Sequence, residues 1–499
     1  MRSTTVRTTT VTSMTARGVA PLLAALLLTA CAAPTFQQPK LDTPAAFKET
    51  AGGIRTAPDG SRWTPARQAE QQPRGEWWLA FQDPRLTELV DEATRNNASL
   101  AVAAARVKQA RAIAGIAQAD RMPQVGLGVQ AQRARPSPLE AGSARSPQNS
   151  YSASLSASYE VDLFGRVRAG VEAARQDAGA SEASYRSVLL SLQADVAQHW
   201  FRLRALDAEL ATVNDAVRLR DESVRVNQRR FDLGDIGEFD LTRAKTELSA
   251  TRAEAIGLQR QRTNAEHALA VLLGRPAARF TAVTSPLPES VALPAIPAGL
   301  PSSLLERRPD IASAQRTMEA ANARIGVARA AMFPALNINA AGGGVGGAMA
   351  DVFNWSSRSW VLGALLSLPI VDGGRNKANV TRSEAALEES VAAYRERVLA
   401  AFAEVEDNLA GVRILAEQGT QVDDAVRSAR RSVELAQKLY DAGRSSYLDL
   451  LDAQRNLASV ERNAVQLRGN QALTTVALIR ALGGGWDAPA PEAAPLAVR

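Results

Sequence analysis

The sequence repeats itself at a spacing of 209 residues, and this repetition constrains the fold more than any other feature. Val226–Leu248 aligns without a gap with Leu435–Leu457, and seven of the 23 aligned residues are identical. The identical pairs include Asp232 with Asp441, Gly234 with Gly443 and Asp240 with Asp449. Upstream the spacing drifts by two residues, so that Pro123 aligns with Pro334. Two related halves predict two copies of one structural unit rather than two or three unrelated domains.

Each half contains a segment that predicts a β-hairpin, at residues 124–162 and 335–370. From Tyr151 to Asp162, twelve residues alternate strictly between apolar or aromatic side chains and serine or an acid. Val125, Leu127 and Val129 alternate in the same way with glycine and glutamine. This period of two is typical of β-strands. The second hairpin alternates less cleanly.

The composition of the strand faces predicts a membrane pore. Serine, glycine and glutamine suit a water-filled lumen, and we expect Ser152, Ser154 and Ser156 to line it. The opposite face, with Tyr151 and Leu155, suits lipid, and strands of about ten residues can cross a bilayer when tilted. Four strands cannot close a barrel, so it must be shared between protomers. A sheet with one face in water and one on a soluble core is the alternative.

Long helices are predicted after each hairpin, at residues 165–273 and 374–482. From about Gly165 to Phe231 the chain has no proline, and a helix of that length would reach roughly 100 Å. After the turn at Gly234–Gly237, eight of ten heptad positions from Leu241 to Leu272 are apolar or small, and the same holds 209 residues later. This pattern indicates packing like that of a coiled coil. A solvated helical stalk would show the same pattern.

The N-terminal sequence predicts a lipoprotein. Residues 1–30 contain three arginines, no acid and an apolar run from Val19 to Leu28, which is typical of a signal peptide. Small residues precede Cys31, the single cysteine, which we expect to be lipidated. The predicted domains are the signal peptide, a first repeat, a proline-rich linker, a second repeat and a flexible tail, at residues 1–30, 31–275, 276–300, 301–486 and 487–499.

Composition and motifs argue against an enzyme and against a nucleic-acid partner. The net charge is +6, of which the signal contributes three, and about +3 is no nucleic-acid signature. The two histidines, His199 and His267, have no second histidine at metal-ligand spacing. Gly342–Gly347 matches a dinucleotide fingerprint formally, but it follows a hairpin strand and no helix opens after it. We therefore expect no cofactor, no metal and no catalytic residue.

Several short motifs stand out along the chain after the signal. They are Trp77-Trp78 with Phe81 and Asp83-Pro84, then Arg308-Pro309-Asp310, Phe333-Pro334, Leu448–Arg455 and Ala481–Trp486. These motifs resemble those of the outer-membrane factor family, a TolC-like superfamily, and most closely its OprM-like lipoprotein channels of resistance-nodulation-division pumps. The resemblance covers nearly all of the chain after the signal, and the last two motifs are the most specific.

The resemblance implies an α+β membrane protein that forms a homotrimer. Four strands per protomer would build a twelve-stranded barrel in the outer membrane, in contact with its lipid. A long helical barrel with a mixed equatorial domain would continue it through the periplasm. The chain would then be the passive exit duct of a tripartite multidrug or solute efflux system, with a periplasmic adaptor and an inner-membrane transporter as partners. Alternatives are a duct for an ATP-driven type I exporter and, last, a lipid-anchored coiled-coil scaffold.

The resemblance also implies a gate at the periplasmic end, drawn from the tip that contains Leu448–Arg455. Leu448 would form an apolar ring and Asp452 an acidic ring around the threefold axis. Tyr440 would latch near Asp232 of the other hairpin, and Arg455 belongs to the same tip. Acids at such turns also cap helices, which is our preferred interpretation of Asp240 and Asp449.

Overall fold

The computed structural model describes residues 36–39, 43–44, 46–50, 75–135, 146–288, 293–294, 296 and 301–484. The predicted signal and Cys31 lie outside the described residues. The chain divides into two compact units. The first, called the sheet unit, comprises Met1–Lys40, Val107–Ala180 and Ala314–Tyr394. The second, called the core unit, comprises Leu41–Arg106, Ser181–Ser313 and Arg395–Arg499.

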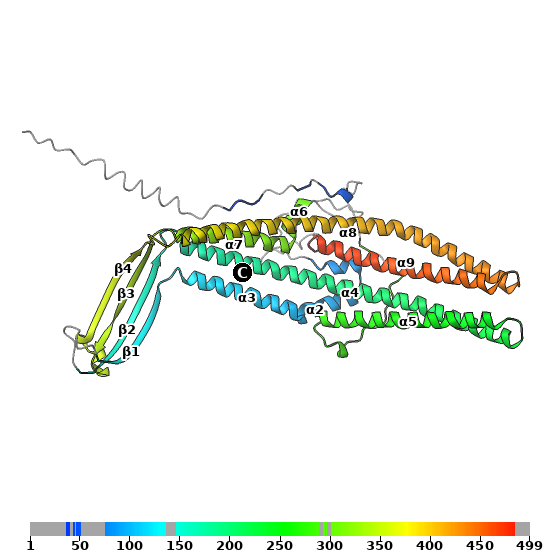
Figure 1. Ribbon diagram of the computed structural model, residues 1–499, viewed down its shortest axis with the longest axis horizontal. Helices are drawn as coiled ribbons and strands as arrows, with labels where there is room; N and C mark the ends of the chain where they lie inside the picture. The colour runs from blue at the N-terminus through cyan, green and yellow to red at the C-terminus, as the bar shows by residue number, and fades with distance from the viewer. Residues whose placement is uncertain are drawn as a thin grey trace, which may run out of the picture. The chain divides into compact units, whose positions relative to one another are not determined.

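A four-stranded antiparallel sheet belongs to the sheet unit (Figure 1). Its strands follow the order of the chain, and they occupy the two segments in which alternation predicts hairpins: β1 (Gln124–Ala134), β2 (Gln148–Val161), β3 (Ala335–Gly346) and β4 (Arg358–Ser367). Strands β2 and β3 also pair, from Tyr151 opposite Gly346 to Val161 opposite Leu336. The hairpins of the two halves therefore form one continuous sheet.

The long helices of the two halves match in length. Helices α4 (Arg166–Asp232) and α8 (Arg375–Asp441) each have 67 residues, and α5 (Glu238–Leu272) and α9 (Tyr447–Ala481) each have 35. Helices α8 and α9 each begin and end 209 residues after their counterparts α4 and α5. Within the described ranges, no helix is both long enough and apolar enough to span a membrane.

Shorter helical elements complete the two units. The α-helices are α2 (Pro84–Asn96), α3 (Ala98–Ala119), α6 (Pro301–Arg307) and α7 (Pro309–Ala330). The 3-10 turns among the described residues are η1 (Lys48–Thr50), η3 (Trp77–Phe81), η4 (Ala277–Arg279), η5 (Met349–Phe353) and η6 (Trp355–Ser357). The Asp83 carboxylate starts α2 by accepting the backbone N–H groups of Arg85 and Leu86 at 3.0 and 3.1 Å.

The core unit packs around side chains from segments far apart in the sequence. Its main cluster joins Trp77 and Trp78 of η3 to Phe201 of α4 and Leu269 of α5, all of them buried. Seven of the ten predicted heptad positions of α5 are buried, which supports the packing pattern expected from the sequence: Leu241, Ala244, Leu248, Thr251, Leu258, Ala265 and Leu269.

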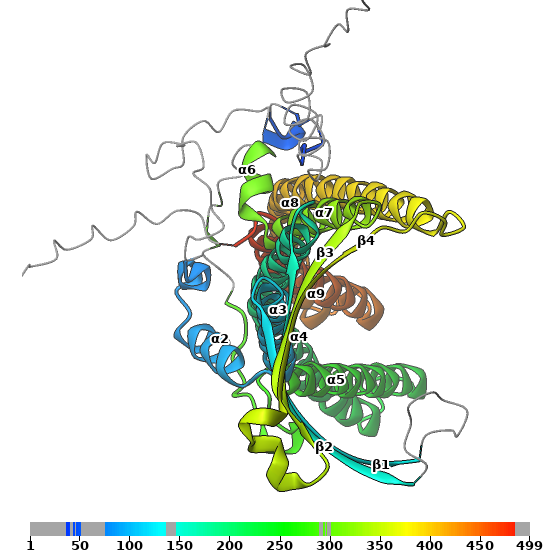
Figure 2. The same ribbon diagram turned by 90° about the vertical axis from the view of Figure 1, so that its left-hand side faces the viewer.

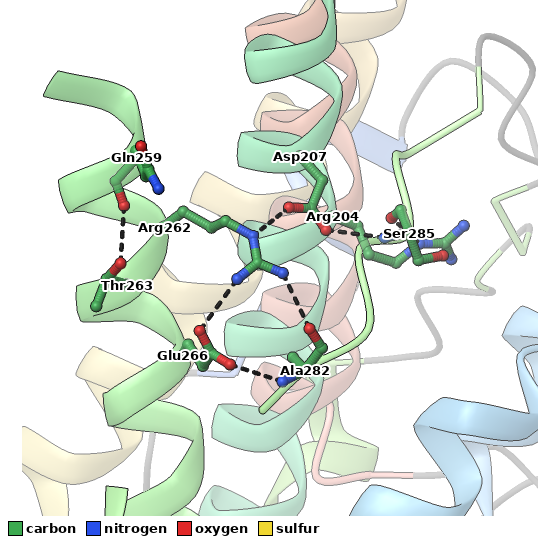
Figure 3. Close-up of polar contacts among 8 residues, drawn as sticks. All are labelled: Arg204, Asp207, Gln259, Arg262, Thr263, Glu266, Ala282 and Ser285. Carbon is green, nitrogen blue, oxygen red and sulfur yellow. Dashed lines mark hydrogen bonds and ion pairs between the residues drawn. The ribbon is translucent and has the colours of Figure 1, made fainter. Parts of the chain in front are cut away.

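A buried ionic network fixes the segment after α5 to the core (Figure 3). The Asp207 side chain of α4, only 1% exposed, accepts from Arg262 of α5 at 2.6 Å. Arg262 also donates to Glu266 at 3.0 Å and to the Ala282 carbonyl oxygen at 3.1 Å. Glu266 accepts the Ala282 backbone N–H at 2.7 Å. Because each carboxylate also holds a backbone group of residues 282–285, the network fastens this connecting segment onto α4 and α5.

Candidate functional site

The strand register separates two faces of the sheet with different chemistry. Leu127 lies opposite Leu155, Leu155 opposite Gly342, and Gly342 opposite Trp360, so these four residues share one face. Alternation places on that face the following set: Val125, Val129, Tyr151, Ala157, Tyr159, Leu336, Ile338, Leu362 and Leu366. We call this side of the sheet the apolar face.

The opposite side carries the residues predicted to line a lumen. Ser152, Ser154 and Ser156 of β2 lie opposite Gln130, Gly128 and Gly126 of β1. On the other side of β2 the same serines lie opposite Val345, Gly343 and Ala341. This serine face is therefore made of hydroxyl, amide and small side chains across β1 and β2, and it becomes more apolar toward β4.

The sheet is curved, and its curvature assigns the two faces. Gly344 belongs to the apolar face, and a Cβ added there would come within 1.9 Å of the Val352 carbonyl oxygen in η5. Figure 2 shows η5 and η6, drawn in yellow-green, on the convex side of the strands. The apolar face is therefore convex and the serine face concave, which is the arrangement that a barrel with a polar interior requires.

The two outer strands of the sheet have one unpaired edge each. Strand β1 pairs only with β2, and β4 pairs only with β3, among the strands that the structure describes. An exposed strand edge carries backbone N–H and C=O groups that readily pair with another chain. In a membrane these groups must be satisfied, and closure with further strands satisfies them.

The second candidate site lies in the core unit, at the two turns that join the long helices. The first turn connects α4 to α5 through Gly234 (φ +79°), and the second connects α8 to α9 through Gly443 (φ +67°). Glycine suits both positions because other residues rarely adopt positive φ. Ser446 caps α9: its hydroxyl accepts the Asp449 backbone N–H, and the Asp449 carboxylate accepts the Ser446 backbone N–H at 2.9 Å. Asp449 thus has the capping role expected of it.

Tyr440 contacts the first hairpin through Arg230. The Arg230 guanidinium donates to the Tyr440 hydroxyl oxygen at 2.5 Å and lies 5.4 Å from the centre of the ring. Asp232, two residues further along, instead accepts a hydrogen bond from Gln228 at 2.9 Å. Burial raises the pKa of Tyr440, so its hydroxyl remains protonated at neutral pH. Tyr440 therefore bonds to Arg230, two residues before Asp232, and the latch of Tyr440 to Asp232 itself stays a prediction.

Arg455 forms an ionic contact between the hairpins. Its guanidinium binds the Glu247 carboxylate of α5 through two N–H groups, one of them at 3.1 Å. These hydrogen bonds hold the pKa of Glu247 below its usual 4.5, so the carboxylate is charged at neutral pH. The contact of Arg455 with Asp452 is longer, at 3.5 Å. A third link joins the hydroxyls of Ser223 and Tyr447 at 2.9 Å.

Leu448 and Asp452 are two of the exposed residues of the second tip. They lie four residues apart on α9, hence on one face of the helix. Leu448 is 39% exposed and the Asp452 side chain 61% exposed. The neighbouring Leu451 is fully buried against Ala244 and Tyr447. At this tip, one face of α9 is therefore buried, and the face with Leu448 and Asp452 is exposed to solvent.

The sequence did not predict the partners on the first hairpin. Glu247 and Arg230 hold Arg455 and Tyr440, but the equivalent positions 209 residues later are Asn456 and Leu439. The repeat therefore gives no signal for either residue. Within the described ranges no group of three or more histidine, cysteine or acidic residues is placed to hold a metal ion.

Comparisons with known proteins agree with this geometry. The family model described as outer membrane efflux protein matches the chain twice, over residues 89–275 and 300–484. Outer membrane protein OprJ of Pseudomonas aeruginosa is 35% identical over 476 residues, which cover 94% of this chain and 96% of OprJ. Cation efflux system protein CusC of Escherichia coli is 32% identical, with coverages of 94% and 98%.

A solved structure supports the same relationship. The outer-membrane channel OprN matches with a TM-score of 0.83 and 28% identity, over 91% of this chain and 99% of OprN. The family consists of efflux channels and is not a class of enzymes. Both the double family match and the identity to OprJ extend over more than half of the chain. The chain therefore belongs to the outer membrane efflux protein family and is an outer-membrane channel of an efflux system.

Proposed function

We propose that this channel is the passive exit duct of a tripartite pump and works as a homotrimer. Three copies contribute twelve strands to one barrel in the outer membrane, and their long helices continue the duct through the periplasm. A periplasmic adaptor and an inner-membrane transporter of the resistance-nodulation-division class supply substrate and energy. The duct itself carries out no reaction.

The open, two-faced sheet is the observation that carries this proposal. Its convex side is apolar and its concave side carries Ser152, Ser154 and Ser156. Its edges, β1 and β4, are left for pairing with other copies. Closing the sheet with two more copies satisfies both edges and places the serine face around water. The common offset of the helices supports two repeats, at residues 31–275 and 301–486, joined by the linker 276–300.

The proposal of an adaptor and a transporter as partners is supported by relatives that are named for efflux systems. CusC is named for a cation efflux system, and 94% of this chain aligns with it. The tips of the α4–α5 and α8–α9 hairpins are the part of the core unit where we place the adaptor. Relatives are named for different cargo, pyoverdine in one case and cations in another, so the proposal assigns no substrate.

A gate at the second tip completes the duct. Leu448 and Asp452 are free of contacts that would bury them, so in a trimer they can meet around the axis as an apolar and an acidic ring. Arg455, bound to Glu247, and Tyr440, bound to Arg230, hold this tip against the first hairpin. Opening then requires these contacts, and the link of Tyr447 to Ser223, to break or to move together with the first hairpin.

Two measurements on the full-length chain test the duct and its anchor separately. Native mass spectrometry of the detergent-extracted protein should give the mass of a trimer with acyl groups on Cys31, and planar bilayers should give single-channel conductance. A monomer without conductance would rule out the duct. A conducting trimer whose Cys31 is unmodified would rule out only the lipid anchor.

A further inference from the structure

The connection between β3 and β4 folds back onto the apolar face of the sheet. Its η5 turn lies directly over the glycines of β3, because a Cβ at Gly346 would come within 2.6 Å of the Asp351 Cβ. Val352 of this turn is buried against the sheet, at 7% exposure. Chain order places the connection at the end of the strands opposite to the junctions with the helices. This end of the convex side is thus thickened by the folded connection.

Aromatic side chains project from this thickened end. Phe353, Trp355 and Trp360 are 78%, 79% and 82% exposed. The loop and the sheet enclose a cleft of about 380 Å³, lined by Ala153, Gly344, Val352, Phe353, Arg358 and Trp360. Large aromatic side chains exposed at the end of membrane strands are typical of the level of the lipid headgroups. If these side chains were surrounded by water alone, their exposed apolar area would be unfavourable.

Two arginines accompany the aromatic residues on the same face. Arg358 lies opposite Gly344, and its guanidinium stacks 3.9 Å from the centre of the Trp355 ring. Arg133 lies two residues beyond Ala131 on β1, hence on the apolar face as well. Neither arginine has an acidic partner among the residues that the structure describes. An arginine left without an acid on an apolar surface suits a phosphate of the lipid headgroup.

From these observations we infer that Arg133, Phe353, Trp355, Arg358 and Trp360 form a docking surface for the phosphorylated glycolipid of the outer leaflet. We call these five residues the outer strip. The inference rests on the proposed barrel, which puts the end of the strands opposite to the long helices in the outer leaflet. The arginines bind the phosphates, and the aromatic side chains and the cleft hold the glycolipid at the boundary between sugar and acyl chain. The β3–β4 connection would then bind lipid in addition to joining the two strands.

Spin labels on single cysteines test where the outer strip lies. In a Cys31→Ser background, labels are placed at Trp355→Cys, Leu362→Cys and Val361→Cys, and the full-length trimer is reconstituted in vesicles that contain the glycolipid. Leu362 is on the apolar face and its neighbour Val361 on the serine face. We expect labels at 355 and 362 to collide with oxygen and to be protected from a water-soluble nickel complex. The label at 361 should be open to nickel.

The three labels separate the inference from the proposed function. Equal nickel access at 361 and 362 would overturn the barrel and, with it, the outer strip. Nickel access at 355 together with protection at 362 would overturn the outer strip alone. A pair of glycines refines the test: Gly344→Ala must displace η5 and should expose the label at 355. Gly342→Ala is the matched control, since its Cβ would meet nothing closer than 3.8 Å.

Retention of glycolipid tests the chemistry of the outer strip. We expect the double variant Arg133→Gln, Arg358→Gln to bind the purified glycolipid about tenfold more weakly than wild type. Each of the two substitutions removes a charged partner of a phosphate. Arg218→Gln, which alters an arginine 75% exposed on α4, is the control and should bind like wild type. Dephosphorylated glycolipid should bind weakly to all variants. Unchanged binding by the double variant, or equal binding of phosphatidylglycerol vesicles, would overturn the assignment.

Discussion

At the scale of single residues, the core unit depends on a carboxylate that has been removed from water. Asp207 is almost fully buried, and Arg262 and the Ser285 backbone N–H are its partners, at 2.6 and 2.9 Å. Removing a charge from water costs several kcal/mol, and a well-placed partner offsets that cost. Breaking such a pair from one side is therefore more harmful than losing an exposed ion pair. The pairs on the surface of α4, such as Arg218 with Asp215, contribute about 0–1 kcal/mol.

Replacing Arg262 by leucine should destabilise the protein strongly. The variant leaves the Asp207 carboxyl group buried and without its cationic partner, and it also releases Glu266. We expect the free energy of unfolding to fall by about 3–5 kcal/mol. Urea titration followed by circular dichroism measures the change, with Arg218→Ala as a control that should lose no more than about 1 kcal/mol. A loss of similar size in both variants would contradict this role of the network.

At the scale of elements, alternation alone gives each strand one apolar and one more polar face, which in the proposed barrel would separate lipid from water. The register keeps this separation continuous from β1 to β4, because no bulge interrupts the three ladders. A shift of one residue in any ladder would bring serines to the convex side. The β3–β4 connection adds a second constraint on the sequence of β3. Positions 344 and 346 must be glycine because a Cβ there would clash with η5.

Arginine at neighbouring positions of β2 should have different effects. At Leu155, on the apolar face, the charge would enter lipid and should cost roughly 2–4 kcal/mol of barrel stability if the residue lies near the midplane. At Ser154, on the serine face, arginine should leave stability nearly unchanged and shift ion selectivity toward anions. Heat-induced dissociation of the barrel and reversal potentials in planar bilayers measure the two effects. Equal destabilisation by Leu155→Arg and Ser154→Arg would argue against a membrane barrel.

The elements could be predicted from the sequence because their signals are local. Alternation in residues 151–162 and the heptad after Leu241 depend on neighbours in the chain, and the repeat doubles each observation. The partners of buried charges are different. Arg262 occupies a heptad position where an apolar residue is expected, and only the packing of α4 against α5 explains it, because Asp207 is 55 residues away. The contact between Arg455 and Glu247 spans 208 residues, and no periodic signal reports such a pairing.

At the scale of the whole molecule, the proposed gate combines an exposed tip with a restraint on the neighbouring hairpin. In the proposed trimer, three Leu448 side chains would exclude water at the axis. Three Asp452 carboxylates held close together would repel one another unless they were protonated or bridged by cations. The links of Tyr440 to Arg230 and of Arg455 to Glu247 oppose that repulsion. In the proposed trimer a closed tip would thus be only marginally favoured, and binding of the proposed adaptor would need to shift the balance by only a few kcal/mol.

Leu448→Ala combined with Asp452→Asn should therefore open the duct. Alanine removes the apolar constriction and asparagine removes the charge that Arg455 contacts at 3.5 Å, so water and ions can pass more readily. We expect higher conductance in planar bilayers and greater sensitivity of cells to large antibiotics. Leu219→Ala with Asp215→Asn changes the same residue types where they are exposed on α4, and it should behave like wild type. Wild-type values for the tip variant in both assays would mean that the channel closes elsewhere.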